Sequence, residues 1–385
     1  MTSTTQRSSA SGVGPRHVLL RSLFAIALLV PVGVLFQAVW RLDSDRASSA
    51  VQERDGIRYL TALGPLTTVL VGAESAAVAG VAVPVDAVTE AIRGVDAVDA
   101  QVGADLGTTE RWGDLRGKIQ TLVGRSPGDR IAAYDAYVDV IDLLMAHYAR
   151  VRDGSGLIQD PSKDAFFLQD AVGDQLPTAV IALGRLADLA ALAPVRPADE
   201  AVETAAGLLA GKEAVVGATD ALTEDFLLAV AITDSRTLSK TMLADIDAFR
   251  LITDKVDGST ALVDGDVTAA DAAEADTSRV DGMSAGTALM EAVASELDRI
   301  VATRLDAVAF DRTVALAAGG LGVLLALTPI ALGIHGRRRS RRGSAEWDIG
   351  ALPDADPGVA HIPARSADLR HLAPVGGREP SGAAR

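Results

Sequence analysis

Two long runs of uncharged, mainly apolar residues lie near the two ends of the chain. Residues 22–40 read SLFAIALLVPVGVLFQAVW, and residues 313–334 read TVALAAGGLGVLLALTPIALGI. A helix that crosses a bilayer needs about 20 consecutive apolar residues, so both runs predict transmembrane helices. Each run holds one proline, Pro31 or Pro329, which membrane helices accept as a local kink. Trp40 ends the first run, where interfacial aromatic residues are favoured.

Between the two runs, apolar residues recur at spacings of three and four, which is the pattern of one helix face. Stripes of this kind are formed by Ile131, Tyr134, Val138, Ile141, Met145 and Tyr148; by Trp112, Leu115, Ile119 and Leu122; by Leu238, Met242, Phe249, Ile252 and Val256; and by Met290, Val293, Leu297, Ile300 and Val308. No segment alternates with period two for long, so strands are not supported. The predicted fold class is all-α, an up-and-down helical bundle flanked by two transmembrane helices.

Turn-forming residues divide this segment into about seven helices. Breaks are expected at 126–129, 153–156, 193–197 and 264–266, and Asp160-Pro161 has the residue types that begin a helix. The segment is long enough for two stacked bundle modules, and the pattern leaves one module or two open.

A third apolar stretch covers Leu60 to Val85. Glu74 lies in its middle, and a charge near the bilayer centre costs about 2.5–3.5 kcal/mol. Prolines and glycines interrupt the stretch as well. We therefore predict a buried helix of the bundle rather than a third span.

Charge is distributed unevenly along the chain. Residues 41–311 carry 45 acidic and 23 basic residues, whereas the remainder carries 6 acidic and 13 basic ones. Arginines precede the first run and follow the second, and basic residues stay on the cytoplasmic side. A plasma-membrane protein with both termini in the cytoplasm is expected, divided into 1–21, a transmembrane helix 22–40, an extracytoplasmic domain 41–312, a transmembrane helix 313–335 and a disordered tail 336–385. Cleavage of the first run as a signal peptide is the alternative.

Composition removes several classes of function. The chain has no cysteine and only five histidines, so thiolate chemistry and a Cys- or His-based metal centre are not expected. The net charge of −15 argues against nucleic-acid binding. No catalytic or nucleotide-binding motif is found. We expect no enzyme activity, no cofactor and no metal.

Three blocks of residues are similar to one group of known domains. They are ERDGIRYL at 53–60 followed by LGPL at 63–66, VDAVD at 95–99 with Trp112, and SGLIQDPSKDAFFL at 155–168 followed by QLP at 175–177. Together they resemble the helical extracytoplasmic sensor domains of membrane-bound chemoreceptors, sensor histidine kinases and diguanylate cyclases. The resemblance covers roughly residues 53–190.

The chain departs from these receptors in three places. A His-Arg-Gly element of the first helix is replaced by Ala73-Glu74-Ser75, the usual Leu before Asp-Pro is Gln159, and no output domain follows the second apolar run. The resemblance implies a sensor-like fold. The first hypothesis for function is a receptor that signals through a separate protein. The alternative is a structural or scaffold protein of the cell envelope whose bundle binds no ligand.

Candidate ligand-binding residues are arginines just after the first apolar run, which could bind an anionic ligand, and aromatic residues that could line a pocket, although the core needs these scarce side chains as well. Helix capping, surface ion pairs and core packing explain the same residue types equally simply. His147 is expected to be satisfied or exposed rather than a pH switch. The candidates are Arg54, Arg58, Tyr59, Trp112, Tyr148, Phe166 and Phe167.

Expected partners are membrane lipid, a second copy of the chain and a separate signalling protein, with a small-molecule ligand of unknown identity. The arginines between 337 and 342 would attract anionic headgroups. Small residues at Ala315 and Gly319, and at Ala318 and Gly322, give the second run a face on which helices can pack closely, as in a homodimer.

Overall fold

The computed structural model describes residues 15–125, 128–157, 163–232, 236–264 and 267–343. These residues are helical almost throughout, and none of them lies in a β-strand, which confirms the all-α prediction. Residues 20–326 form one compact unit, which contains the helical bundle. The described residues of the second unit, 15–19 and 327–343, belong to the ends of the first and last helices.

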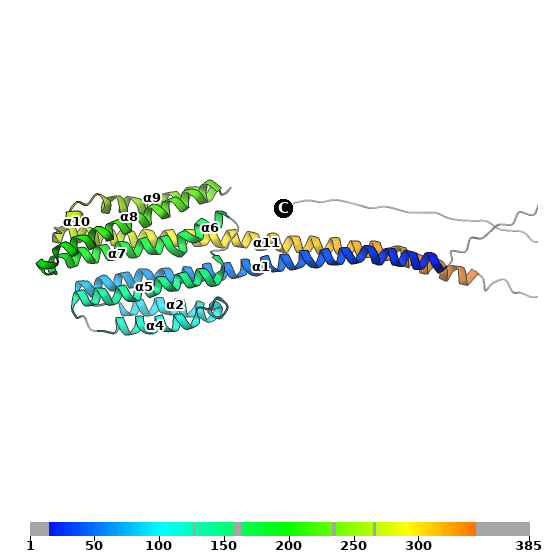
Figure 1. The fold of residues 1–385 in the computed structure, drawn as a ribbon, viewed down its shortest axis with the longest axis horizontal. Helices are drawn as coiled ribbons and strands as arrows, with labels where there is room; N and C mark the ends of the chain where they lie inside the picture. Colours follow the sequence, from blue (N-terminus) through cyan, green and yellow to red (C-terminus); the bar gives the residue numbers. More distant parts are fainter. Residues whose placement is uncertain (1–14, 126–127, 158–162, 233–235, 265–266, 344–385) are drawn as a thin grey trace, which may run out of the picture. The chain divides into compact units, whose positions relative to one another are not determined.

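Nine helices of eight residues or more make up the described chain, joined by short helical turns (Figure 1). They are α1 (Pro15–Ala79), α2 (Val85–Val98), α4 (Thr109–Val123), α5 (Arg130–Ser155), α6 (Lys163–Asp170), α7 (Leu176–Leu192), α8 (Ala201–Ile232), α9 (Arg236–Asp257) and α11 (Ala269–Gly343), of which α6 is the shortest. The shorter elements are α3 (Ala104–Leu106), α10 (Ala261–Asp264), the π-helices η1 (Asp99–Gly103) and η3 (Ala171–Gln175), and the 3₁₀ turns η4 (Ala193–Val195) and η5 (Ala198–Glu200).

The two longest helices, α1 and α11, run antiparallel and contact each other at several levels. Thr68 of α1 faces Thr287 of α11, with their hydroxyl oxygens 3.4 Å apart. Further along, Arg54 forms an ion pair with Asp298 at 2.5 Å. A third contact joins Glu53 of α1 to Arg304 of α11. From one contact to the next, the residue numbers fall on α1 and rise on α11, so the two helices pack lengthwise in opposite directions.

The remaining helices form two groups, one beside each long helix. Helices α2, α4 and α5 form one group, in which Tyr148 of α5 lies beside Thr67 of α1 (Figure 1). Helices α7, α8 and α9 form the other, in which α7 and α9 lie against Gly286 of α11, and α5 also contacts α7. The guanidinium of Arg130, at the start of α5, donates hydrogen bonds to the carbonyls of Val78 on α1 and Ala191 on α7. The two groups therefore lie alongside each other over the same stretch of α1, rather than stacked end to end, and they share one core.

The apolar stretch from Leu60 onward is buried in this core. Leu60, Leu63, Leu66 and Leu70 have no exposed surface, and Glu74 is fully buried with them. The stretch therefore belongs to the interior of the bundle, together with its one carboxyl group. This agrees with the prediction of a buried bundle helix.

Local sequence signals account for several helix ends. Gly80 ends α1 and Gly156 ends α5, each with a φ of 72°, a conformation that glycine adopts without strain. At the start of α11, Thr268 and Asp271 cap each other: the Thr268 amide donates to the Asp271 carboxylate at 2.8 Å, and the Asp271 amide donates to the Thr268 hydroxyl at 3.3 Å. The expected breaks at 126–127, 160–161 and 265–266, and the tail from 344, lie outside the described residues.

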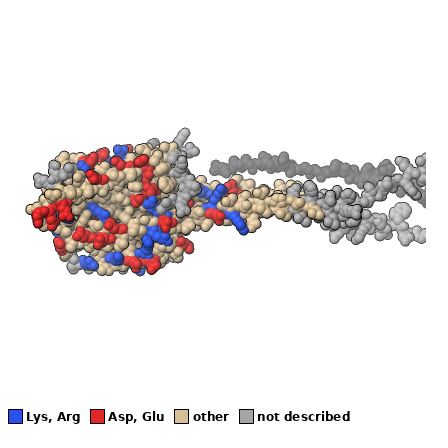
Figure 2. All heavy atoms as spheres, viewed as in Figure 1, with Lys and Arg blue, Asp and Glu red and all other residues tan. Residues whose placement is uncertain are grey.

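Three helical stretches are long and apolar enough to cross a membrane: Leu29–Ala79, Ala165–Val195 and Ala269–Thr328. This supports association with a membrane. In the space-filling view, charged side chains cover the bundle, whereas the surface of the paired long helices beyond it is largely uncharged (Figure 2). At the border, the Arg312 guanidinium lies 5.4 Å from the centre of the Trp40 ring and donates to the Ser44 hydroxyl at 3.1 Å.

Small residues let helices approach closely at several points. A Cβ atom at Gly319 would lie 3.5 Å from the Phe36 ring, so this small residue of the second apolar run faces α1 of the same chain. In the core, a Cβ at Gly184 of α7 would overlap the side chain of Val71 on α1. Val71 is β-branched and buried, so it has little room to move aside. Gly184 therefore sets the distance between α1 and α7.

We expect Gly184→Ala to lower the free energy of unfolding by about 1–2 kcal/mol, because overpacking outweighs the better helix propensity of alanine. Gly217→Ala, at an exposed position of α8 with nothing within 4 Å of the new Cβ, is the matched control and should be neutral or stabilising by up to about 1 kcal/mol. Urea unfolding of the detergent-solubilised chain, followed by circular dichroism, measures both. Equal effects of the two substitutions would contradict the tight α1–α7 contact.

Candidate functional site

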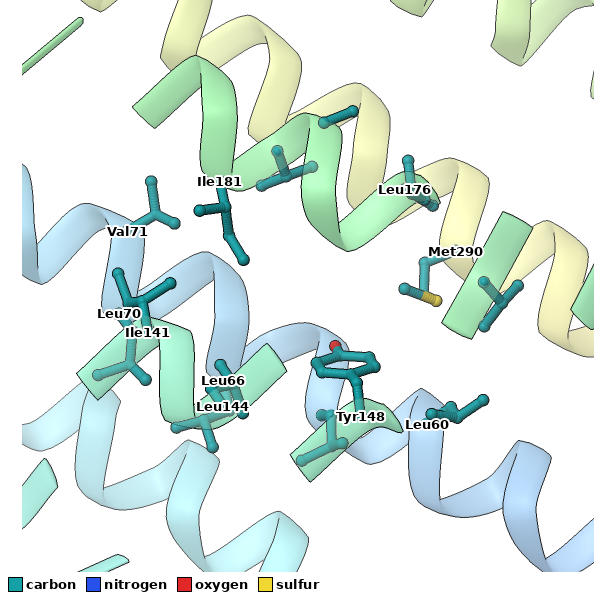
Figure 3. Close-up of a cluster of buried hydrophobic side chains, with 14 of the residues drawn as sticks. Leu60, Leu66, Leu70, Val71, Ile141, Leu144, Tyr148, Leu176, Ile181 and Met290 are labelled. Atoms are coloured by element: carbon teal, nitrogen blue, oxygen red, sulfur yellow. The ribbon is translucent and has the colours of Figure 1, made fainter. Parts of the chain in front are cut away.

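A cavity of about 100 Å³ lies where the two helix groups and the two long helices meet. It is lined by residues of α1, α5, α7 and α11, and its surface is mainly apolar. In the close-up, Tyr148 of α5, Leu176 of α7 and Met290 of α11 approach one another around this region, beside Leu60 of α1 (Figure 3). The lining residues are Thr61, Gly64, Pro65, Thr67, Thr68, Tyr148, Leu176, Pro177, Val180, Gly286, Thr287, Met290 and Glu291.

Residue types that weaken or thin a helix produce this cavity. Pro65 lies inside α1 and has no amide hydrogen, so the carbonyl of Thr61 receives no helical hydrogen bond from it. Gly64 contributes no side chain to the space between α1 and α11, and Gly286 contributes none to the space between α11 and α7. Pro177 lies where the π-helical turn η3 continues into α7, and it too has no amide hydrogen to donate to the preceding turn.

The polar groups of the cavity are hydroxyls. The Thr67 hydroxyl donates to the Leu63 carbonyl at 3.0 Å and lies 2.9 Å from the Tyr148 hydroxyl. Since the single hydroxyl proton of Thr67 is used by Leu63, Tyr148 is the donor of this pair. Burial raises the pKa of Tyr148, so the phenol stays neutral.

Two further threonines face each other across the cavity. Thr68 donates to the Gly64 carbonyl at 3.2 Å, and Thr287 donates to the Met283 carbonyl at 2.8 Å. Their protons are thus directed into their own helices, while their oxygen lone pairs remain as acceptors. The only charged lining residue, Glu291, is exposed at the edge. The arrangement suits a small, uncharged, mainly apolar ligand with a hydrogen-bond donor.

A buried polar network lies closer to the end of the bundle from which α1 enters. Asp99 of η1 accepts hydrogen bonds from the Tyr59 hydroxyl at 2.8 Å and the Thr108 hydroxyl at 2.9 Å. The His147 Nε2 lies 3.1 Å from the Tyr59 oxygen. The extra residue of the π-helical turn brings Asp99 inward, so this network fastens the α2–α4 connection to α1 and α5.

The electrostatics of this network keep His147 neutral. Burial lowers the pKa of His147 to about 4, and Arg111 lowers it as well, against an opposing effect of Asp99. The Trp112 ring lies 5.9 Å from the imidazole and its indole nitrogen donates to Asp96 at 2.7 Å. The Nε2 of His147 thus has a hydrogen-bond partner, as expected for a satisfied histidine. Its buried Nδ1 has none.

The candidate residues from the sequence do not form one site. Tyr148 lines the cavity, and Tyr59 and Trp112 belong to the buried network. Arg54 and Arg58 line an open groove near the end of the bundle, where Asp298 already neutralises Arg54.

Phe166 and Phe167 lie on α6, apart from the cavity. Their rings meet edge to face at 5.5 Å, with Phe166 partly exposed and Phe167 packed against the core. Each of the two side chains therefore takes a different face of its helix, as adjacent positions require.

Sequence reasoning missed most residues of the cavity. The cavity combines Thr67 and Thr68 of α1 with Thr287 and Met290 of α11, more than 200 residues away in the sequence. Within its own helix, none of these residue types indicates a binding site. The one usable signal was the Gly64-Pro65 pair within an otherwise regular apolar stretch.

Within the described ranges, no group of three or more His, Asp or Glu side chains could hold a metal ion. Comparisons of the chain with protein-family models, curated proteins and solved structures find no match.

We expect the pH dependence of stability to include a contribution from His147. The folded chain resists protonation of His147 down to pH about 4, whereas the unfolded chain takes up that proton near pH 6.5. The contribution of neutral His147 to the free energy of unfolding is therefore complete above pH 6.5. It is lost as the pH drops towards 4, by up to about 3 kcal/mol. His147→Gln, which cannot become charged, should remove this loss.

Urea unfolding of wild type and His147→Gln at pH 8, 6 and 4.5 tests this. At pH 8 the histidine is neutral in both the folded and the unfolded chain, so the difference in free energy of unfolding measured there gives the effect of the substitution without any charge. Parallel losses of stability in wild type and His147→Gln between pH 6.5 and 4 would show that another group is responsible.

Proposed function

We propose that this chain is a two-pass membrane protein whose extracytoplasmic helical domain acts as a receptor for a small molecule and signals through a separate partner protein. The observation that carries the proposal is the position of the cavity. The cavity is lined by both long helices, α1 and α11, and by one helix of each group, α5 and α7. An occupant therefore contacts all four helices at once, and a change in their relative positions changes its contacts.

Two features support a two-pass arrangement, and the arginines that flank the two apolar runs favour a cytoplasmic location for both termini. Apolar side chains of the two terminal runs are strongly exposed, including Leu35 at 66%, Leu324 at 65% and Leu325 at 65%. Exposed apolar surface of this extent is suited to lipid. By contrast, the third candidate stretch, Ala165–Val195, is 61% buried inside the protein and has no need of a bilayer.

The proposed signal is a shift of α1 relative to α11. A ligand moves such an equilibrium only by the difference between its affinities for two arrangements. The cavity meets this condition because Thr68 and Thr287 lie on opposite long helices, so a change in their separation changes the ligand's contacts directly. Shifts of about 1–2 Å between packed helices are a common form of such transitions. The helices then pass the shift to a protein within or beside the membrane.

The function is tested by a thermal-shift screen of the detergent-solubilised full chain against small, uncharged, mainly apolar molecules. A ligand at 100 times its dissociation constant should stabilise the domain by about 2.7 kcal/mol. Thr287→Leu places a larger side chain in the cavity and should weaken binding at least tenfold. Thr303→Leu is the matched control, since Thr303 is exposed on the same helix and makes the same bond, to the Arg299 carbonyl at 2.8 Å.

Binding that survives in Thr287→Leu would place the ligand elsewhere. A cooperative melt that no compound changes, in wild type or control, would overturn the receptor proposal and favour a scaffold role in the cell envelope, with a ligand-free bundle.

The orientation is tested with single cysteines, because the chain has none of its own. Glu213 is exposed on α8, and Ser340 follows the second apolar run. In intact cells, a membrane-impermeant maleimide should label Glu213→Cys and leave Ser340→Cys unmodified until the membrane is permeabilised. Labelling of Ser340→Cys alone in intact cells would reverse the proposed topology.

A further inference from the structure

Two carboxyl groups are buried at the α1–α7 contact, beyond the cavity. Glu74 of α1 is fully buried and Asp188 of α7 is 3% exposed. Both oxygens of Glu74 and the Oδ2 of Asp188 have no hydrogen-bond partner. The helices run parallel here, since Val71 meets Gly184 and Arg130 joins the carbonyls of Val78 and Ala191, so the two acids occupy matching levels between these contacts.

The arginines nearest to these acids are engaged elsewhere. Arg185 of α7 forms its ion pair with Asp142 of α5 at 2.5 Å. Arg279 of α11 forms its ion pair with Asp276, one turn earlier on the same helix, at 2.6 Å. Neither guanidinium lies within ion-pair distance of Glu74 or Asp188 in the described structure. A negative charge at either acid is therefore only weakly compensated.

The other polar groups around the pair are neutral. Tyr134 and Tyr137 of α5 face Glu74, and burial raises the pKa of each phenol to about 12, with Glu74 adding to the effect. Ser75 of α1 adjoins Asp188. The Tyr137 hydroxyl, like the Ser75 hydroxyl, is buried without a hydrogen-bond partner. The positive charges of Arg185 and Arg279 act on Glu74 only from a distance and lower its pKa less than burial raises it.

Such an environment favours the protonated acids. Burial raises the pKa of Glu74 well above its ordinary value, and the neighbouring Asp188 raises it further. Burial also raises the pKa of Asp188 to about 7, although Ser75 and Arg279 lower it in part. Ionising either group in place would leave an uncompensated charge in the core, which the protein avoids by taking up a proton or by opening the contact.

We propose that Glu74 and Asp188 form a proton-controlled contact between α1 and α7, closed when both carboxyl groups are protonated and loosened when they ionise. This inference rests on the proposed receptor function, for which it supplies the regulation. The coupling follows from position: Val180, Gly184 and Asp188 succeed one another on one face of α7, at spacings of four. Val180 lines the cavity, and Gly184 touches Val71 of α1. Loosening the acid pair therefore alters a wall of the cavity.

The first test is urea unfolding of the full-length chain in detergent between pH 4 and 8. Because the folded acids bind protons more tightly than the unfolded ones, the folded chain holds the extra protons and its stability falls as the pH rises through this window. Each acid can raise the unfolding constant by up to about tenfold per pH unit. Glu74→Gln and Asp188→Asn remain neutral, so they should match wild type near pH 4 and unfold at least tenfold less readily than wild type at pH 8.

Differences between variant and wild type at each pH isolate this effect from that of His147, which has the opposite sign. Glu213→Gln is the matched control, because Glu213 is exposed on α8, and its difference from wild type should not vary with pH. A purely structural role for the acids would give variants that are less stable than wild type at every pH, which would overturn the proposal.

The second test asks whether α1 moves. Ser48 is exposed on α1 and Ala307 is exposed on α11. Spin labels attached to Ser48→Cys and Ala307→Cys report the separation of the two long helices by pulsed electron resonance. The distance distribution should differ between pH 5 and pH 8, and Glu74→Gln with Asp188→Asn should fix it in the pH 5 form. A distribution independent of pH in the otherwise wild-type chain would overturn the proton-controlled contact.

The two proposals fail separately. Ligand stabilisation that is the same at pH 5 and pH 8 would leave the receptor function standing and remove its proton control. A pH-dependent distance in a chain that no compound stabilises would retain the proton-controlled contact and remove the small-molecule receptor.

Discussion

The packing of α1 against α11 is the constraint on which the other contacts depend. Both helices carry an apolar surface suited to lipid at one end and supply core residues to the bundle at the other. No break separates the two environments in either helix. A change in the register of this pair would therefore alter the core, the cavity and the contact of Trp40 with Arg312 together. The shorter helices are arranged around this pair, in two groups that share its buried face.

The scarcity of aromatic residues shapes how this core is filled. Only 4% of residues are aromatic, so helices must approach closely through glycine and alanine to exclude water. Gly184 and Gly286 show the result: each accepts a valine of a neighbouring helix where any side chain would overlap it. Where Pro65 interrupts the regular backbone bonding of α1, this close packing ends and the cavity begins.

Element type was predictable from the sequence, because the three- and four-residue spacing of apolar positions survives in single helices. Trp112, Leu115, Ile119 and Leu122 are all buried, as their stripe predicts. The prediction was less complete for α5. Its stripe omitted Tyr137, which is also buried, because α5 packs against α4 on one side and α7 on another. A helix between two groups has no single polar face, and its pattern cannot show which neighbours it has.

The candidate sites were much less predictable. The cavity depends on the spatial meeting of Thr68 and Thr287, which are 219 residues apart in sequence. Glu74 was recognised as unusual in an apolar stretch, but nothing near it in the sequence pointed to Asp188. Of the seven candidate residues, Tyr148 alone lines the cavity. The similarity to sensor domains was no guide here, since it concerns motifs and not the space between helices.

Pro65 gives α1 a geometry with mechanical amplification. From Pro65 to Trp40 the helix spans 25 residues, or about 37 Å at 1.5 Å per residue. Over this lever arm, each degree of bending at Pro65 displaces Trp40 by about 0.6 Å. Trp40 is held by Arg312 of α11, so such a displacement is passed to the second long helix. Because Ile57, Tyr59 and Leu60 of the same arm are buried in the core, a bend at Pro65 moves the core and the distant contact together.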